Sequence, residues 1–145
     1  MVRVRRAETD ADVADALAVR RAVFVEEQGV PEEIEVDGED DAATHFVAYD
    51  GDRPIGAARL REVESGVGKV ERVAVRRPRR GEGIGRALMA ELERMAASAG
   101  IETLTLHAQT HVESFYDDLG YETTSDVFEE AGIEHVEMEK DIDGR

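Results

Sequence analysis

The first half of the chain alternates between apolar and polar positions in a way that predicts strands. Residues 2–5 alternate Val with Arg, and the runs 45–49 and 55–63 are largely apolar. An Asp-Gly-Asp turn at 50–52 separates these two runs, which is typical of an antiparallel hairpin. We therefore expect an N-terminal strand followed, further along, by a hairpin.

A helix is predicted between the first strand and the hairpin. It begins at Thr9 or Asp10, either of which can cap it, and apolar positions recur at helical spacing as far as about Gln28. The acidic segment Glu32–Asp41 has no periodicity, and we expect a solvated loop there. The alternative is a mobile, negatively charged wall over a site for a cationic substrate.

The second half of the chain repeats a strand-to-helix order. A strand at Val70–Val75 leads through the glycine-rich segment Arg80–Gly85 into a helix that has one apolar face and ends at Gly100. A further strand is expected at 103–107.

The C-terminal part is expected to hold one short helix and two strands. The helix covers 112–119, and the strands at 121–124 and 133–140 flank a loop at 125–132. Beyond Asp141 the tail is expected to fray.

The turn Arg80–Gly85, placed between a strand and a helix, indicates an anion site. The first helical turn has N–H groups without intrahelical partners, and glycines let a phosphate approach the backbone. The Walker pattern fails at Arg86 and Ala87, and the dinucleotide fingerprint fails at Leu88, where its third glycine should stand. The pattern that remains is R-x-x-G-x-G; a simple glycine-eased turn is the alternative interpretation.

Composition narrows the class of protein. The 145 residues suit a single domain, 1–145, and the absence of cysteine excludes disulfides and thiolate metal sites. No apolar run approaches the ~20 residues that span a bilayer, and no signal peptide is apparent, so a cytoplasmic protein is expected.

The formal net charge of −16 disfavours nucleic acid and anionic membranes as partners. Because salt screens self-repulsion, we expect a salt-adapted, halophilic source, with an ordinary acidic protein as the alternative. Against this background five arginines surround the glycine turn and favour an anion-ligand site over a solvated patch: Arg76, Arg77, Arg79, Arg80 and Arg86.

Two motifs resemble the GNAT N-acetyltransferases. Arg80–Gly85 resembles the pyrophosphate loop with which that family holds coenzyme A, and the sequence F-Y-D-D-L-G-Y at 115–121 resembles its F-Y-x-x-L-G-F signature. The segments 22–28, 106–111 and 131–135 resemble the ElaA-like branch more closely. The resemblance implies an α/β fold with a mixed, mostly antiparallel sheet that is splayed at its central strands and flanked by helices.

The resemblance also implies that acetyl-coenzyme A lies in the splay, with its pantetheine arm on the backbone at 73–75 and its pyrophosphate on the N–H groups of 81–86. Many GNAT proteins carry Asn where this chain has Gln109, which leaves that contact open. The implied cofactor-binding residues are Val73, Ala74, Val75, Arg80, Gly81, Glu82, Gly83, Ile84, Gly85, Arg86 and Gln109.

Acetyl transfer to an amine needs a base to remove an ammonium proton and a donor for the departing thiolate. The family resemblance gives the donor role to Tyr116; a packed aromatic whose hydroxyl bonds elsewhere is the alternative. Glu71 and His107 together are the preferred base candidates, and His111 is a third. Residues expected to line the acceptor side are Gln28, His45, Arg72, His111 and His135. The histidines are spread over the chain without the i, i+4 spacing on a helix that a metal site would use, since His107, four positions before His111, lies in an expected strand; no metal is expected.

Two classes of function follow. The first is an N-acetyltransferase that moves an acetyl group from acetyl-coenzyme A to a small-molecule or peptide amine by direct attack in a ternary complex. The second is a module that binds acetyl-coenzyme A for sensing or for a partner protein, without turnover. The last two strands also allow a homodimer through sheet extension.

Overall fold

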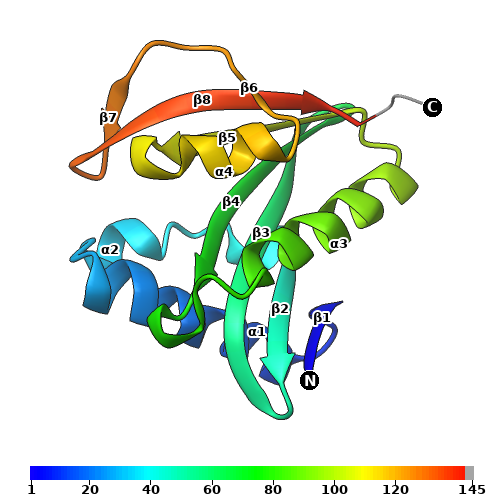
Figure 1. Ribbon diagram of the computed structural model, residues 1–145. Helices are drawn as coiled ribbons and strands as arrows, with labels where there is room; N and C mark the ends of the chain where they lie inside the picture. Colours follow the sequence, from blue (N-terminus) through cyan, green and yellow to red (C-terminus); the bar gives the residue numbers. More distant parts are fainter. Residues whose placement is uncertain (143–145) are drawn as a thin grey trace.

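A computed structural model describes residues 1–142 of the chain, and within them eight strands form one sheet (Figure 1). The strands are β1 Val2–Arg6, β2 Thr44–Asp50, β3 Arg53–Glu64, β4 Val67–Val75, β5 Thr103–Gln109, β6 Glu122–Thr123, β7 Phe128–Glu130 and β8 Ile133–Asp141. Their order is β1-β2-β3-β4-β5-β8-β6, with β7 also paired to β8. The pair β4–β5 is parallel and the other pairs are antiparallel, including the predicted β2–β3 hairpin.

Helices cover both faces of this sheet. They are α1 Asp10–Arg20, which continues as a π-helical segment Arg21–Glu27, then α2 Glu32–Glu35, α3 Ile84–Ser98 and α4 Glu113–Asp118. Side chains alternate along β2, so Phe46 packs with the α3 core while Val47 packs with the α1 core. The Thr9 hydroxyl accepts a hydrogen bond of 3.1 Å from the Asp12 amide, which confirms Thr9 as the cap of α1.

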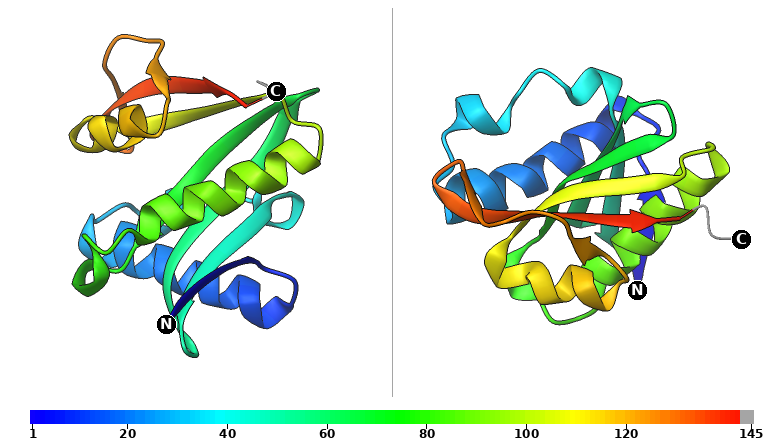
Figure 2. Two further views of the ribbon diagram at one scale, coloured as in Figure 1. Left: turned by 45° about the vertical axis from the view of Figure 1, so that its right-hand side comes forward. Right: turned by 90° about the horizontal axis from the view of Figure 1, so that it is seen from above.

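The sheet opens between β4 and β5, as expected. The two strands pair from Val67 with Thr103 to Val70 with Leu106, and beyond that point they diverge. Figure 2 shows β5 and β8 rising away from the rest of the sheet. β4 therefore continues for five residues, 71–75, with one edge unpaired. The α/β fold with a splayed, mostly antiparallel sheet is confirmed.

Two predicted loops are wrong in part. The segment 32–41 contains α2 and the start of a 3₁₀ turn at Asp40–Ala42, and the segment 125–132 contains β7. The segment 32–41 is mostly exposed, as expected, although its Glu35 is only 4% exposed. It is held by ion pairs to arginines that the sheet and α1 bury. The tail was expected to fray beyond Asp141, but the Ile142 amide donates a 2.8 Å hydrogen bond to the Glu102 carbonyl; residues 143–145 lie outside the described part.

Candidate functional site

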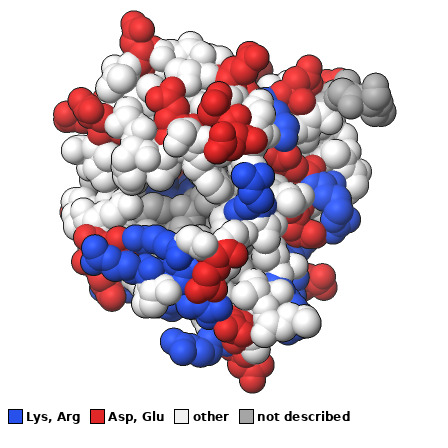
Figure 3. Space-filling view, in the orientation of Figure 1, with Lys and Arg blue, Asp and Glu red and all other residues white. Residues whose placement is uncertain are grey.

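A cleft of about 1010 Å³ occupies the splay between β4 and β5. Figure 3 shows a hollow across this face, with basic side chains along its lower edge. Of the candidate site residues, all except Glu82 and His45 line the cleft. The Glu82 side chain turns to Arg79 instead, with contacts of 2.9–3.1 Å. His45 is 4% exposed on β2, where its Nε2 lies 3.0 Å from the Asp40 carbonyl oxygen, so its predicted place in the acceptor site is wrong.

The glycine turn presents unused backbone donors to the cleft. Gly81 and Gly83 have φ values of +82° and +83°, which glycine adopts without strain, and Gly83 caps α3. The amide groups of residues 81–86 donate no hydrogen bond to any described residue, and the first capping bond comes from Ala87 to the Gly83 carbonyl. Six consecutive N–H groups without partners, leading into the positive end of a helix, can donate to an anion.

The two sequence motifs meet at the start of α3. A Cβ atom added at Gly85 would lie 3.2 Å from a ring carbon of Phe115. A side chain at 85 would therefore push α4 away from the glycine turn, because the ring fills the space that a side chain needs. The close approach explains why glycine stands at that position.

The five clustered arginines serve different purposes. Arg76 donates to the Pro54 carbonyl at 2.9 Å, and Arg79 pairs with Asp50 and Glu82. Arg80 donates to the Val75 carbonyl and forms a two-point pair with Glu27, at 2.6 and 2.7 Å. Within residues 1–142, Arg77 and Arg86 make no hydrogen bond or ion pair; both are exposed, and Arg86 lines the cleft.

A bulge re-aims β4 where it leaves β5. Ala57 pairs with Ala74 but Arg59 pairs with Glu71, so β4 carries one extra residue there. Arg72 takes a φ of +56°, which costs a non-glycine residue on the order of 1 kcal/mol. Its guanidinium is tethered to the Glu35 side chain at 2.9 Å and to the Asp37 side chain at 3.3 Å. These contacts offset the strain.

Polar groups on the other wall bridge the cleft. Gln109 at the end of β5 donates a 3.0 Å hydrogen bond to Gln28, which follows the π-helical segment. The two candidates, one predicted for the cofactor and one for the acceptor, thus contact each other across the opening.

Tyr116 lines the cleft from α4 and is 8% exposed. Its ring packs edge-on against Phe115 and Tyr121. No hydrogen bond joins its hydroxyl to another described residue, unlike the Tyr121 hydroxyl, which donates to Glu93 at 2.8 Å. Burial raises the pKa of the Tyr116 hydroxyl above its ordinary value, so the group is a protonated phenol at neutral pH.

Three histidines lie in or near the cleft. His107 on β5 contacts Glu130 Oε1 through Nδ1 at 2.9 Å, and its ring stands edge-on to Phe128. The His135 ring stacks on Phe128, and its Nδ1 lies 2.7 Å from the Ile133 carbonyl oxygen. The hydrogen bond from His107 lowers the pKa of the Glu130 carboxyl. His111 lines the cleft and is exposed.

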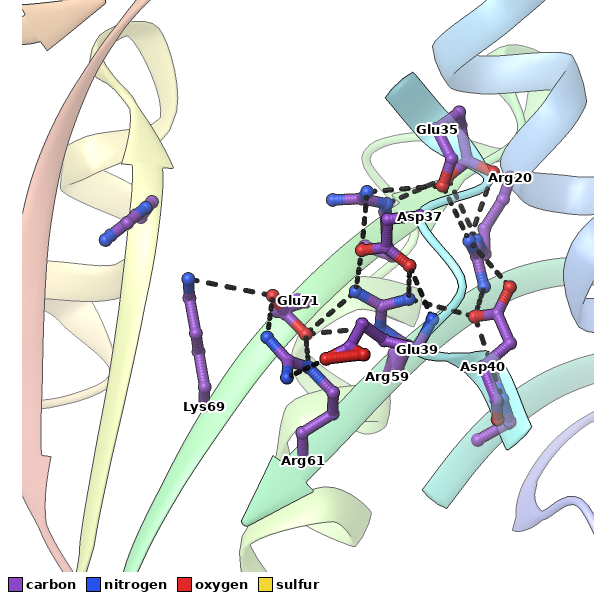
Figure 4. A network of polar contacts seen from close by, with 12 residues as sticks. Arg20, Glu35, Asp37, Glu39, Asp40, Arg59, Arg61, Lys69 and Glu71 are labelled. Atoms are coloured by element: carbon purple, nitrogen blue, oxygen red, sulfur yellow. Dashed lines mark hydrogen bonds and ion pairs between the residues drawn. The ribbon is translucent and has the colours of Figure 1, made fainter. Parts of the chain in front are cut away.

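An ionic network forms the wall beside β4 (Figure 4). Arg59 on β3 is 0% exposed and donates to three carboxylates, those of Asp37, Asp40 and Glu71, at 2.7–3.2 Å. Arg20 is equally buried and pairs with Glu35 and Asp40. The network joins five carboxylates to five cations: Glu35, Asp37, Glu39, Asp40 and Glu71 with Arg20, Arg59, Arg61, Lys69 and Arg72.

Glu71 belongs to this network. Burial by itself would raise the pKa of its carboxyl, but hydrogen bonds and attraction from Arg61 and Arg59 outweigh burial and hold the pKa below the ordinary value. A carboxylate clamped in this way is a weak proton acceptor. The sequence paired Glu71 and His107 as the preferred base candidates. The contacts of Glu71 make it a poorer candidate than His107.

Sequence reasoning missed the buried arginines and their acidic partners. Arg59 interrupts the apolar run 55–63, and Arg20 falls on the helical face that also carries Val13 and Leu17. A charged residue on an apolar face is a signal for a buried ion pair. The acidic segment 32–41 supplied the missing partners.

Two further observations bound the chemistry. No three His, Asp or Glu side chains among residues 1–142 are placed to hold a metal ion. None of the helices in this range combines the length and apolar character needed to cross a membrane.

Comparison with known proteins identifies the family to which the chain is similar. The acetyltransferase (GNAT) domain model matches residues 6–142. YjcF of Bacillus subtilis, named as an uncharacterized N-acetyltransferase, is 42% identical over 136 residues, which cover 93% of this chain and 96% of YjcF. ElaA of Escherichia coli is 32% identical over 131 residues, 87% of this chain and 85% of ElaA.

Solved structures share the overall fold of this chain. A Lactobacillus plantarum protein superposes with a TM-score of 0.91 at 33% identity, covering 97% of this chain and 98% of that chain. Crystalline ElaA of E. coli gives a TM-score of 0.87 at 26% identity, with 97% and 100% covered. These relatives lend no support to a halophilic source, which stays a prediction from charge. The chain belongs to the GNAT acetyltransferase family.

Proposed function

We propose that this protein transfers an acetyl group from acetyl-coenzyme A to a primary amine by direct attack in a ternary complex. The observation that carries the proposal is the row of six unpartnered amides at 81–86, next to the unpaired edge of β4. That pairing suits a ligand with a pyrophosphate at one end and an amide-bearing arm at the other. A single domain and a cytoplasmic location belong to the same proposal.

The cofactor would be held mainly by backbone groups. The pyrophosphate sits on the N–H groups of 81–86, with Arg80 and Arg86 beside it, and the pantetheine amides add to the edge of β4 at 73–75. A solved aminoglycoside 6'-N-acetyltransferase, 17% identical with a TM-score of 0.80, shares this fold and is complexed with coenzyme A.

The chemistry needs three groups. The neutral amine nitrogen attacks the thioester carbon, a C–N bond forms, and an N–H near Val73 on the bulge would stabilise the oxyanion. The C–S bond then breaks, the Tyr116 hydroxyl gives its proton to the departing thiolate, and the tyrosinate regains a proton through water from the N–H that the tetrahedral intermediate loses. The unpartnered hydroxyl in the cleft supports this role.

His107 is the better supported base. Glu130 orients its ring through Nδ1, as a second carboxylate often does for a catalytic imidazole, while Glu71 is neutralised by arginines. His107 takes the ammonium proton directly or through water, and Glu71 then holds the wall of the cleft. The proton lost by the amine and the proton given by Tyr116 are thus handled by separate groups.

Thiol release from acetyl-coenzyme A over a panel of amines tests the proposal. Isothermal titration should first show coenzyme binding, and Tyr116→Phe should lower amine-dependent release about 100-fold without changing that affinity. Tyr121→Phe removes a hydroxyl that points to Glu93 and serves as the matched control, with activity retained. Binding without release for any amine would favour the sensing module, and absence of binding would refute the proposal.

A further inference from the structure

Each carboxylate that lines the cleft has a basic side chain beside it. Glu35 and Asp37 pair with Arg72 and with buried arginines, and Glu71 pairs with Arg59 and Arg61. Glu130 contacts His107, and Glu27 contacts Arg80. A polycationic acceptor would therefore find no spare carboxylate on the described walls. The acidic segment 32–41, despite its composition, does not make this a cation site.

One cation of the ionic network is held only by a long ion pair. Lys69 on β4 is 25% exposed, and its ammonium makes no hydrogen bond with a described residue. Its nearest carboxylate oxygen, Glu71 Oε2, is 3.7 Å away and already accepts from Arg61 at 3.1 Å. Figure 4 shows Lys69 at the edge of the network that lies nearest β5.

The residue type adds to the argument. The chain has eighteen basic residues and only two of them, Lys69 and Lys140, are lysines. Every ordered pairing in the network uses an arginine, whose planar fork fixes a carboxylate at two points. A lysine at the edge keeps a mobile point charge on a flexible stem, which suits a ligand group that arrives and leaves.

The face on which Lys69 lies is the acceptor side. Val70 packs in the α3 core, so Lys69 and Glu71 point to the opposite face of β4. On β5 the buried Leu104, Leu106 and Ala108 face α3, and His107 therefore shares the face of Lys69.

We propose that the acetyl acceptor is an amine that also carries a carboxylate, and that Lys69 binds this carboxylate as a specificity-determining residue. The inference rests on the proposed acetyl transfer and names its substrate class. Lys69 lies four positions before Val73 on β4, and the bulge at Arg72 lies between them. An acceptor with several methylene groups between its amine and its carboxylate, such as the ω-amino acid 5-aminopentanoate, suits this separation.

Matched acceptors test the charge. Transfer to 5-aminopentanoate, to its neutral amide and to spermidine is measured by thiol release, and binding of the same three to the protein loaded with coenzyme A is measured by titration calorimetry. The acid should bind and react best. An acid that does no better than its amide, including the case in which neither binds, overturns the proposal. Coenzyme affinity is recorded separately, so failure of the acetyltransferase proposal itself is recognised by its loss.

Matched variants test the residue. Lys69→Met keeps the length of the side chain, and it should raise KM for the acid about tenfold or more while KM for the amide changes less than about twofold. Lys69→Arg should restore most of the discrimination. Lys140→Met removes the other lysine, which lies on β8 and pairs with Glu93 of α3, and should leave both KM values unchanged. A fall in kcat for acid and amide alike would instead show that Lys69 only supports the fold.

Discussion

Replacement of Arg59 by Met should destabilise the protein far more than its single charge suggests. The guanidinium makes five hydrogen bonds to Asp37, Asp40 and Glu71 and is completely buried. Removing one partner of a buried ion pair leaves uncompensated charge and costs ~3–5 kcal/mol. Asp40 keeps Arg20 and Glu71 keeps Arg61, so we expect ~3 kcal/mol here, the lower end.

The assay is urea unfolding followed by circular dichroism at pH 7. Against a typical total stability of ~5–15 kcal/mol, such a loss shifts the midpoint strongly. Arg94→Met is the matched control, because Arg94 pairs with Glu91 on the exposed face of α3 and should give no measurable shift. An Arg59→Met midpoint equal to the wild-type value would refute the reasoning about the network.

Acidification gives an independent check on the same variant. Hydrogen bonds from Arg59 hold the pKa of Asp37 below its ordinary value, and for Asp40 the pairing with Arg20 and Arg59 outweighs the opposing effect of burial. A lowered folded-state pKa contributes stability above the unfolded-state pKa of ~4, and that contribution is lost as the pH falls through the folded-state value. The gap between wild type and Arg59→Met should therefore narrow below about pH 4.

Two further substitutions probe the ends of the cleft. Glu27→Gln removes the carboxylate that pairs with Arg80 and should tighten coenzyme A binding about three- to tenfold in calorimetry. Glu26→Gln, at the exposed neighbouring position, is the control and should leave the affinity unchanged. Weaker binding in Glu27→Gln would contradict this reasoning. His107→Gln should lower kcat about 100-fold at unchanged coenzyme affinity, while Glu71→Gln should mainly lower the urea midpoint; the reverse pattern would assign the base to Glu71.

Local features of the site were predictable from the sequence. The glycine turn at 80–85 combines a strand, positions of positive φ and a helix start within a few residues, and these constraints act between neighbours. The splay followed from family resemblance, because nothing in the periodicity of 70–75 or 103–107 says where pairing between two parallel strands stops. The bulge at Arg72 was also not predictable, because a single arginine in a strand pattern gives no signal of a left-handed φ.

The ionic network was not predictable because its partners are far apart in the sequence. Arg59 and Asp37 are 22 positions apart, and Arg20 and Glu35 are 15 apart. Composition identifies the charges of the segment 32–41 but not which arginines will meet them. Burial of those arginines decides the outcome, since a buried guanidinium without carboxylates is too costly to persist. A segment that looks solvated therefore becomes an ordered wall.

The net charge of −16 and a polyanionic cofactor are compatible because electrostatic effects in the cleft are local. At physiological salt the screening length is ~8 Å, so distant carboxylates contribute little at the glycine turn. The nearby carboxylates of Glu27 and Glu82 are held by Arg80 and Arg79, and the amides of 81–86 act at contact distance. The same reasoning applies at the other end, where each cleft-lining carboxylate has a basic neighbour and the Lys69 ammonium makes no hydrogen bond to a described residue. Net charge thus describes the charge of the solvent-exposed surface, whereas ion pairs between side chains determine the chemistry of each end of the cleft.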